Sequence, residues 1–315
     1  MTAPSPGLVT THPATEARVT CRPAVVVNPT KVSNARTLHA VLTKALSRAQ
    51  IVAEPIWLET TPQDPGFGQT QAALAHGADL VMAYGGDGTV RSCAAALAAT
   101  GVPLAMLPGG TGNLLARNLD IPLTLRAAVD VAIGGSVRPI DVCHASDEDF
   151  ITMAGIGFDA RMMANTSAAL KREFGWLAYG LAAMRTMSAA PTMRIRLELD
   201  DGRSRTTSGV GVLAANVGTL TGGITLLPHA VADDGLLAVA VLTPRRLRDW
   251  AGLGGRLTSH RAPKPTQLRC WQTRSVQVSL DRPALVEIDG EVLDERDELD
   301  CSVTPGALAV KVPLA

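Results

Sequence analysis

The chain has 315 residues, of which 46% are hydrophobic, 18% are charged and 3% are aromatic, and its formal net charge is zero. Neutral charge with so few aromatic side chains argues against a nucleic-acid-binding protein, which needs a basic surface and aromatic rings for stacking. The five cysteines, at positions 21, 93, 143, 270 and 301, lack any CxxC spacing. We therefore expect reduced thiols in a cytoplasmic protein, not a disulfide framework or a zinc site.

The first 21 residues are rich in Pro, Thr and Ala. They lack the basic start and apolar run of a signal peptide, so we expect a disordered tail at 1–21. Gly or Pro interrupts each uncharged apolar run before it reaches the length needed to span a membrane. The sequence thus favours a cytoplasmic location and leaves a peripheral position at the inner membrane face open.

Residues 22–140 alternate between apolar segments and segments of helical periodicity. The apolar segments, at 23–29, 54–61, 79–85 and 103–109, are typical of buried strands. The helical segments lie at 35–50, 69–78 and 90–100 and begin again at 113. Because the expected strands are apolar throughout, we predict a parallel α/β sheet covered by helices on both faces.

After residue 140 the pattern changes to strands separated by turn residues, in RIRLELDDG, GVGVLAAN, LLAVAVLT, SVQVSLD, ALVEIDG and ALAVKVP. This pattern predicts a mostly antiparallel β domain over 141–315. One helix is expected at 167–188, either packing in the core or forming a lip for acyl chains. The acidic run DERDELD at 294–300 is expected to be a solvated turn.

Two glycine-rich segments each follow an apolar strand and open a helix: AYGGDGTV at 83–90 and PGGTGN at 108–113. Glycine lets the backbone approach a ligand closely, and ligands of α/β sheets bind at the carboxyl ends of the strands. The positive end of the following helix favours phosphate. We expect Thr89 to cap a helix that begins near Val90, and Thr111 and Asn113 to cap the next one. Two adjacent junctions of this kind suit a polyphosphate.

Asp87 would stand beside this anion site, where its charge repels phosphate unless a cation such as magnesium lies between them. The alternative is an ordinary Gly-Asp-Gly turn. The lysine of the GxxxxGK[ST] pattern is absent, so the chain is not a P-loop protein.

Together with Asn-Pro at 28–29 and EIDGE at 287–291, these motifs resemble the diacylglycerol kinase catalytic family. This family includes bacterial lipid kinases and the sphingosine and ceramide kinases. The resemblance runs from about residue 22 to the C-terminus, and the pairing of GGDGT with GTGN makes it specific. It implies an N-terminal α/β nucleotide-binding domain at 22–140 and a C-terminal antiparallel β-sandwich domain at 141–315. The active site would lie in the cleft between the two domains.

The resemblance also implies the site residues. Asp289 and Glu291 would be catalytic, one of them as the general base on the lipid hydroxyl; an ordinary Asp-Gly hairpin turn is the alternative. In DDGLLAV (233–239), the Asp234 carboxylate and the carbonyls of Val231 and Leu236 would bind magnesium. Thr60 is a better match than Thr61 for a further nucleotide contact. The residues expected at ATP are Asn28, Pro29, Thr30, Lys31, Val32, Thr60, Gly85, Gly86, Asp87, Gly88, Thr89, Val90, Arg91, Ser92, Gly110, Thr111, Gly112 and Asn113.

Three positions depart from the pattern of many family members. Val32 replaces a glycine, Ser92 replaces a glutamate and Leu114 replaces an aspartate. The loss of two acidic groups bears on how magnesium is handled rather than on the nucleotide site as a whole.

The resemblance implies an ATP- and magnesium-dependent lipid kinase that phosphorylates a membrane lipid alcohol such as diacylglycerol. Its partners would be ATP and a lipid at the membrane surface, with a homodimer left open. One alternative is a kinase of a soluble substrate, like the NAD kinases, with Asp87 as the base. Another is a nucleotide-binding regulator without catalysis, which Ser92 and Leu114 favour and the intact DGE motif opposes.

Overall fold

The computed structural model describes residues 21–31, 35–157, 192–220, 223–244, 246–259, 261 and 263–314. The tail before Cys21, Val32 and the helix expected at 167–188 lie outside these residues. Among the described residues, no helix is both long and apolar enough to cross a bilayer.

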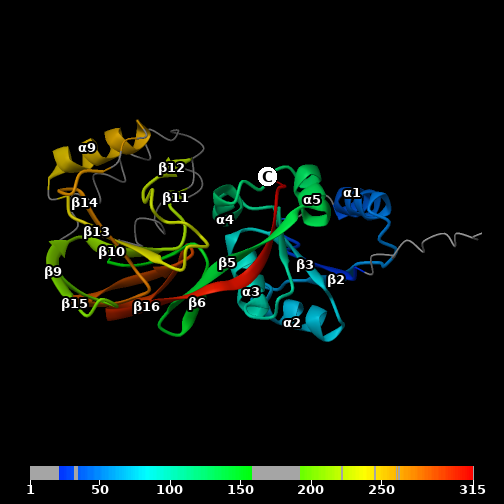
Figure 1. Ribbon diagram of the computed structural model, residues 1–315, viewed down its shortest axis with the longest axis horizontal. Helices are drawn as coiled ribbons and strands as arrows, with labels where there is room; N and C mark the ends of the chain where they lie inside the picture. The colour runs from blue at the N-terminus through cyan, green and yellow to red at the C-terminus, as the bar shows by residue number, and fades with distance from the viewer. Residues whose placement is uncertain are drawn as a thin grey trace, which may run out of the picture.

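The N-terminal half, which carries α1 to α5 in Figure 1, contains a parallel sheet. Its strand order is β4–β3–β1–β2. Alternate side chains of these strands point to opposite faces of the sheet and belong to two apolar clusters. One cluster includes side chains of α1 and α5, and the other includes side chains of α2, α3 and α4. This two-sided burial explains the uninterrupted apolar runs and confirms the predicted α/β architecture. The elements are β1 (Pro23–Val27), α1 (Ala35–Arg48), β2 (Ile56–Glu59), α2 (Phe67–Ala75), β3 (Leu80–Gly85), α3 (Asp87–Leu97), β4 (Leu104–Pro108), α4 (Leu114–Asn118) and α5 (Leu125–Gly134).

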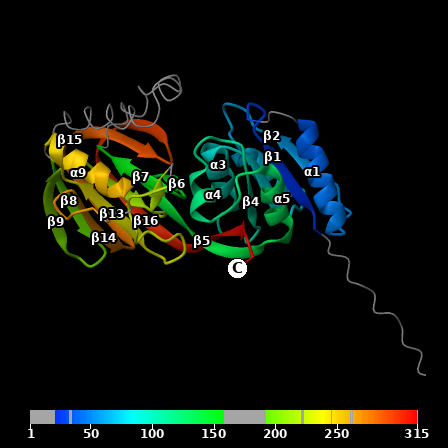
Figure 2. The same cartoon turned by 90° about the horizontal axis from the view of Figure 1, so that it is seen from above.

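The C-terminal half is an antiparallel β-sandwich, as predicted (Figure 2). Its core gathers side chains of β8, β10, β13 and β15, and α9 packs Trp250 and Leu253 against another apolar cluster. The elements are β6 (Glu148–Phe150), β7 (Met153–Ile156), β8 (Met193–Leu199), β9 (Ser204–Gly209), β10 (Gly211–Ala215), β11 (Thr219–Leu220), β12 (Ile224–Thr225), β13 (Leu237–Leu242), α9 (Leu247–Thr258), β14 (Leu268–Thr273) and β15 (Ser275–Ile288).

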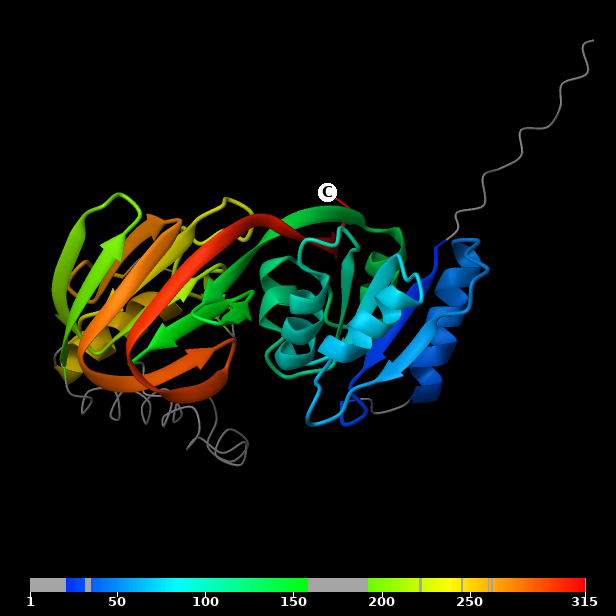
Figure 3. The same ribbon diagram turned by 90° about the horizontal axis from the view of Figure 1, so that it is seen from below.

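Two long strands join the halves (Figure 3): β5 (Ser136–Ala145) and β16 (Glu291–Val312) run antiparallel from the sandwich to the parallel sheet. There, Val310 pairs in parallel with Leu104 of β4. The end of the chain therefore packs into the core of the N-terminal half. The division at residues 140 and 141 stays a prediction, because these strands belong to both halves.

The acidic run at 294–300 was expected to be a turn, and this expectation is wrong. It lies within β16, paired with β15, and most of its side chains face solvent. The segment SVQVSLD and the first five residues of ALVEIDG belong to one strand, β15, with irregular register between Ser279 and Ala284. The acidic run is extended because it pairs with β15, and its composition alone does not predict this pairing.

Candidate active site

The predicted nucleotide loops meet at the carboxyl ends of the parallel strands. The Asn28 N–H donates to the carbonyl of Tyr84 at 2.9 Å, and the Thr60 N–H donates to the carbonyl of Val27 at 2.9 Å. The Gly109 N–H reaches the carbonyl of Gly85 at 2.8 Å. The Asn-Pro loop, Thr60 and both glycine loops thus share one edge of the sheet, as the sequence predicts.

The two glycine loops touch through their backbones. A Cβ added at Gly110 would lie 2.7 Å from the Cα of Gly86, and one at Gly85 would lie 2.5 Å from the hydroxyl of Thr89. Gly88 differs, since no heavy atom of the described residues would lie within 4 Å of its Cβ. Gly85 and Gly110 are therefore required by packing, whereas the protein leaves open space beside Gly88.

Asp87 ties the two loops together. Its carboxylate accepts the backbone N–H groups of Asn113 at 2.9 Å and Leu114 at 2.6 Å, at the start of α4. The expectation that Asn113 caps α4 through its side chain is wrong. Asn113 occupies the N-cap position with φ 48°, but its side chain bonds to the backbone of Gly110. The Asp87 charge is thus already met by N–H donors.

Thr89 also differs from its expected role as a cap. Helix α3 begins at Asp87, with Gly86 at the N-cap and no side-chain cap. Thr89 therefore sits inside the first turn, only 3% exposed, and its hydroxyl lies 3.5 Å from the amide nitrogen of Asn28. In the structure it joins the Asn-Pro loop to the first glycine loop.

The DGE motif forms a tight turn between β15 and β16. Asp289 and Gly290 have φ of 48° and 88°, and Ile288 pairs with Glu291 across the turn. Positive φ at both central residues is the backbone of a two-residue hairpin, so the turn reading of this motif holds as well.

The Asp289 carboxylate is anchored to the first residue of β7 and the two residues before it. It accepts the N–H groups of Ile151 at 3.0 Å and of Thr152 and Met153 at 2.9 Å each, together with the Thr152 hydroxyl. Burial raises the pKa of the Asp289 carboxyl, and these hydrogen bonds oppose the rise. The side chain is thus held in one orientation with a heightened affinity for a proton.

Glu291 reaches the N-terminal half. Its carboxylate forms an ion pair with Arg91 of α3, whose Nη1 also lies 3.5 Å from the carbonyl of Ile288. The Glu291 side chain is 60% exposed and that of Arg91 is 15% exposed. The structure therefore brings the turn with the predicted catalytic pair next to α3, which begins within GGDGT.

Comparison with known proteins agrees with this geometry. Residues 22–145 match the family model described as diacylglycerol kinase catalytic domain. Residues 152–312 match the model described as YegS C-terminal NAD kinase beta sandwich-like domain. The chain belongs to the diacylglycerol kinase family.

Its relatives in this family include a "Probable lipid kinase YegS-like" of Pseudomonas fluorescens, 36% identical over 77% of this chain and 80% of that protein. A "Diacylglycerol kinase" of Mycobacterium tuberculosis is 31% identical over 54% of this chain and 57% of its own length. A solved diacylglycerol kinase structure from Bacillus anthracis shares the fold, with a TM-score of 0.75 and 24% identity over 92% of this chain and 96% of the other. The chain is thus a member of a lipid kinase family.

Two buried residues near the DGE turn of this family member have no role assigned from the sequence. Asn216 donates from its side chain to the carbonyls of Asp141 and Ile151, both at 3.1 Å, and so holds the segment that anchors Asp289. Glu287 is only 9% exposed. Burial raises the pKa of the Glu287 carboxyl and the charge of Asp289 raises it further, while the Gly290 N–H opposes this. A polar residue at the end of an apolar strand was the available signal in both cases.

The predicted magnesium ligands of the family lie on the loop before β13. The Asp234 carboxylate accepts the Leu236 N–H at 3.0 Å. Burial raises the pKa of Asp234, as do the charges of Asp141 and Asp233, and a cation would offset this crowding of carboxylates. Among the described residues no group of three or more His, Cys, Asp and Glu could hold a metal ion. One carboxylate with the carbonyls of Val231 and Leu236 suits magnesium chemically, and this site stays a prediction.

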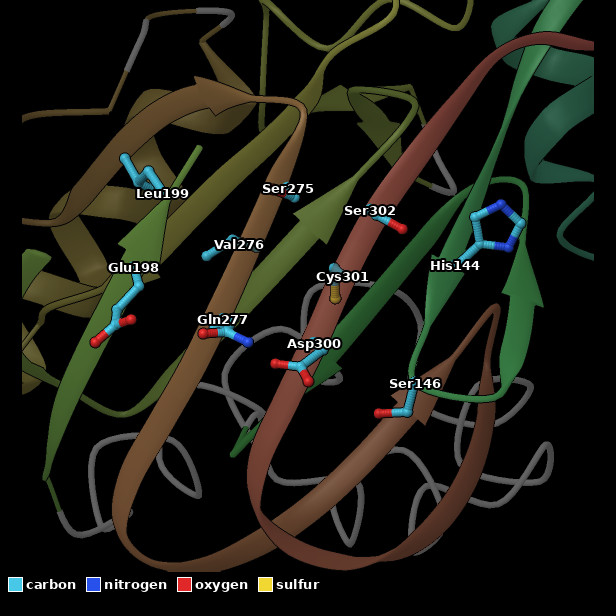
Figure 4. Close-up of a pocket in the computed structure, with 10 residues that line it drawn as sticks. All are labelled: His144, Ser146, Glu198, Leu199, Ser275, Val276, Gln277, Asp300, Cys301 and Ser302. Atoms are coloured by element: carbon cyan, nitrogen blue, oxygen red, sulfur yellow. The ribbon is translucent and has the colours of Figure 1, made fainter. Parts of the chain in front are cut away.

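A separate groove of about 370 Å³ lies over β8, β15 and β16 (Figure 4). Glu198, Gln277 and Asp300 lie side by side across these three strands along it. None of its lining residues is a predicted site residue of the kinase family. We assign the groove no part in the reaction.

Proposed function

We propose that this protein uses ATP and magnesium to phosphorylate the hydroxyl of a membrane lipid alcohol such as diacylglycerol. The observation that carries this proposal is the contact between the DGE turn and α3, through Arg91 and Glu291. It puts the predicted acid–base residues beside the helix whose N-terminus is predicted to face the phosphates. Membership of a lipid kinase family supports the same substrate class.

In this proposal the nucleotide lies across the loops at the carboxyl edge of the parallel sheet. The first N–H groups of α3 and the helix dipole bind phosphate oxygens. The open space beside Gly88 lets the phosphates approach the backbone. Magnesium, when bound, supplies positive charge to the phosphate oxygens.

Asp289 is the general base in this proposal. Its Oδ1 accepts three donors, whereas its Oδ2 accepts only the Ile151 N–H in the described part of the chain. Oδ2 therefore keeps a lone pair for the lipid hydroxyl, and the raised pKa of Asp289 suits it to take a proton. The hydroxyl proton passes to Oδ2 as the hydroxyl oxygen bonds to the γ-phosphorus, and ADP leaves with the electrons of the broken P–O bond.

The alternative NAD kinase mechanism would use Asp87 as the base. The two Asp87 oxygens accept the N–H groups of Asn113 and Leu114. In this proposal Asp87 therefore joins the two glycine loops, and Asp289, on the turn that Arg91 contacts, takes the proton.

The proposal is tested by following labelled γ-phosphate from ATP, with magnesium, into diacylglycerol, ceramide, sphingosine and phosphatidylglycerol in mixed micelles, with NAD in a parallel reaction. We expect a labelled lipid. The Asp289→Asn variant should lose at least about a hundredfold in rate, the usual contribution of a general base, while still binding ATP. Label in NADP instead, or no label in any acceptor despite bound ATP, would contradict a lipid kinase. An active Asp289→Asn variant would contradict the assigned base.

A further inference from the structure

Arg91 contacts both sides of the DGE turn from the other half of the molecule. Its Nη1 lies 3.5 Å from the carbonyl of Ile288, before the turn, and its Nη2 pairs with the carboxylate of Glu291, after it. Arg91 and Glu291 are 200 residues apart in sequence. Since Asp289 is held by the segment 151–153 of its own half, the turn is fixed from two directions.

Arg91 also neutralises the charge of the Glu291 carboxylate, which accepts no backbone N–H group in the described part of the chain. Asp87 accepts two N–H groups, and Asp289 accepts three N–H groups and a hydroxyl. Glu291 has no such backbone donor in the described part of the chain, and its partner there is Arg91. An uncompensated Glu291 would add negative charge where the phosphates of the nucleotide are proposed to bind.

The guanidinium is well placed for this task. Arg91 is in the second turn of α3, and its side chain is only 15% exposed. A planar guanidinium can hold a carbonyl and a carboxylate at once, which an ammonium group does less well. The low exposure reduces the screening of the pair by water on the arginine side.

We propose that Arg91 is a positioning residue that acts through Glu291: it holds the DGE turn against α3 and cancels the Glu291 charge that would otherwise repel ATP. The family resemblance implied that Arg91 contacts ATP; in this proposal its partner is the protein. The inference rests on the proposed function for the effect on turnover. Its effect on ATP binding can be measured without any lipid.

The experiment measures ATP affinity by equilibrium titration, and kcat and KM where turnover is found, for wild type, Arg91→Ala, Glu291→Gln and the double variant. Arg91→Ala should weaken ATP binding by about tenfold, since it leaves one like charge near the phosphates. Adding Glu291→Gln should restore ATP affinity but not kcat, because Arg91 no longer holds the turn against α3. Arg91→Lys should keep ATP affinity and lose kcat, since it keeps the charge without the double contact.

Arg48→Ala is the matched control, because it breaks an exposed ion pair with Asp130 on α5 that no proposed step uses. If Glu291→Gln fails to restore ATP affinity to Arg91→Ala, Arg91 contacts the nucleotide itself and the proposal is wrong. The proposal would also be overturned if Arg91→Ala lost as much thermal stability as Arg48→Ala and kept its ATP affinity. A further outcome separates the two proposals. If Glu291→Gln restores ATP affinity to Arg91→Ala, but the wild type binds ATP and phosphorylates no lipid, the proposed function is contradicted and the charge relation is supported.

Discussion

The carboxylate of Asp87 accepts the backbone N–H of Leu114 at 2.6 Å, so a side chain of the first glycine loop fastens the helix that follows the second. The family resemblance leads us to expect an aspartate at position 114, where this chain has a leucine. Only the backbone of Leu114 enters the bond, so the contact does not depend on which side chain stands there. The aspartate of GGDGT therefore has a structural task that does not depend on a metal ion.

Replacing Asp87 by alanine should lower the free energy of unfolding by about 2 kcal/mol, because two N–H groups lose a charged acceptor. ATP affinity should fall with it, since the glycine loops are no longer tied together. Urea unfolding and ATP titration measure the two effects. Asp147→Ala, in the exposed turn between β5 and β6, is the control and should change neither. Lost ATP affinity with unchanged stability would assign Asp87 to the ligand instead.

Gly110→Ala should destabilise the protein by about 1–3 kcal/mol through overpacking. The new methyl would lie 2.7 Å from the Cα of Gly86, a backbone atom that cannot rotate away. Gly134→Ala is the matched control: it lies at the end of α5, and no heavy atom of the described residues is within 4 Å of the added Cβ. It should leave stability unchanged or raise it slightly. Equal melting temperatures for the two variants would contradict the close approach.

Gly88→Ala separates the ligand from the fold. The structure has room for the methyl, and alanine favours a helix over glycine, so stability should stay unchanged or rise by about 0.5–1 kcal/mol. ATP affinity should nevertheless fall by about tenfold or more, because the methyl takes the space proposed for a phosphate. Calorimetric titration with ATP alongside thermal unfolding checks both. Normal ATP binding would mean that no phosphate approaches the backbone here.

The sequence predicted β1 to β4 and the helices between them closely, because their apolar periodicity is local. The alignment of the glycine loops also followed, since parallel neighbours end at the same edge. Helix α5 was missed although Leu125, Ala128, Val129 and Ala132 have helical spacing. This spacing is local and is sufficient to predict the helix.

The cap of α4 could not be predicted from the sequence in the same way. Asn113 is a favourable residue for an N-cap, yet Asp87, which is 26 residues earlier, takes the role. This choice depends on how closely β3 and β4 bring their loops together. The pairing of Arg91 with Glu291 and the path of β16 into the parallel sheet are likewise set by contacts between distant segments, which local composition does not encode.

Glu287 gives a prediction that depends on pH. The pKa of Glu287 is raised in the folded protein, so the free energy of unfolding falls as the pH rises above the ordinary carboxyl pKa, and the full loss is reached once the pH exceeds the raised value. Below about pH 4 the side chain is protonated in both states and the cost vanishes. Glu287→Gln cannot ionise and keeps an acceptor for the Gly290 N–H. The variant should therefore match wild type in acid and be more stable than wild type at neutral pH.

Urea unfolding between about pH 4 and pH 7.5 measures this difference. Glu298→Gln is the matched control, because Glu298 is an exposed carboxylate on β16, and it should show no comparable change with pH. A Glu287→Gln variant that is less stable than wild type at neutral pH would mean that the ionised carboxylate has a partner stabilising it. A stability gain confined to neutral pH would instead show that the fold keeps a buried acid beside Asp289 at the expense of stability, as expected where proton affinity matters for the reaction.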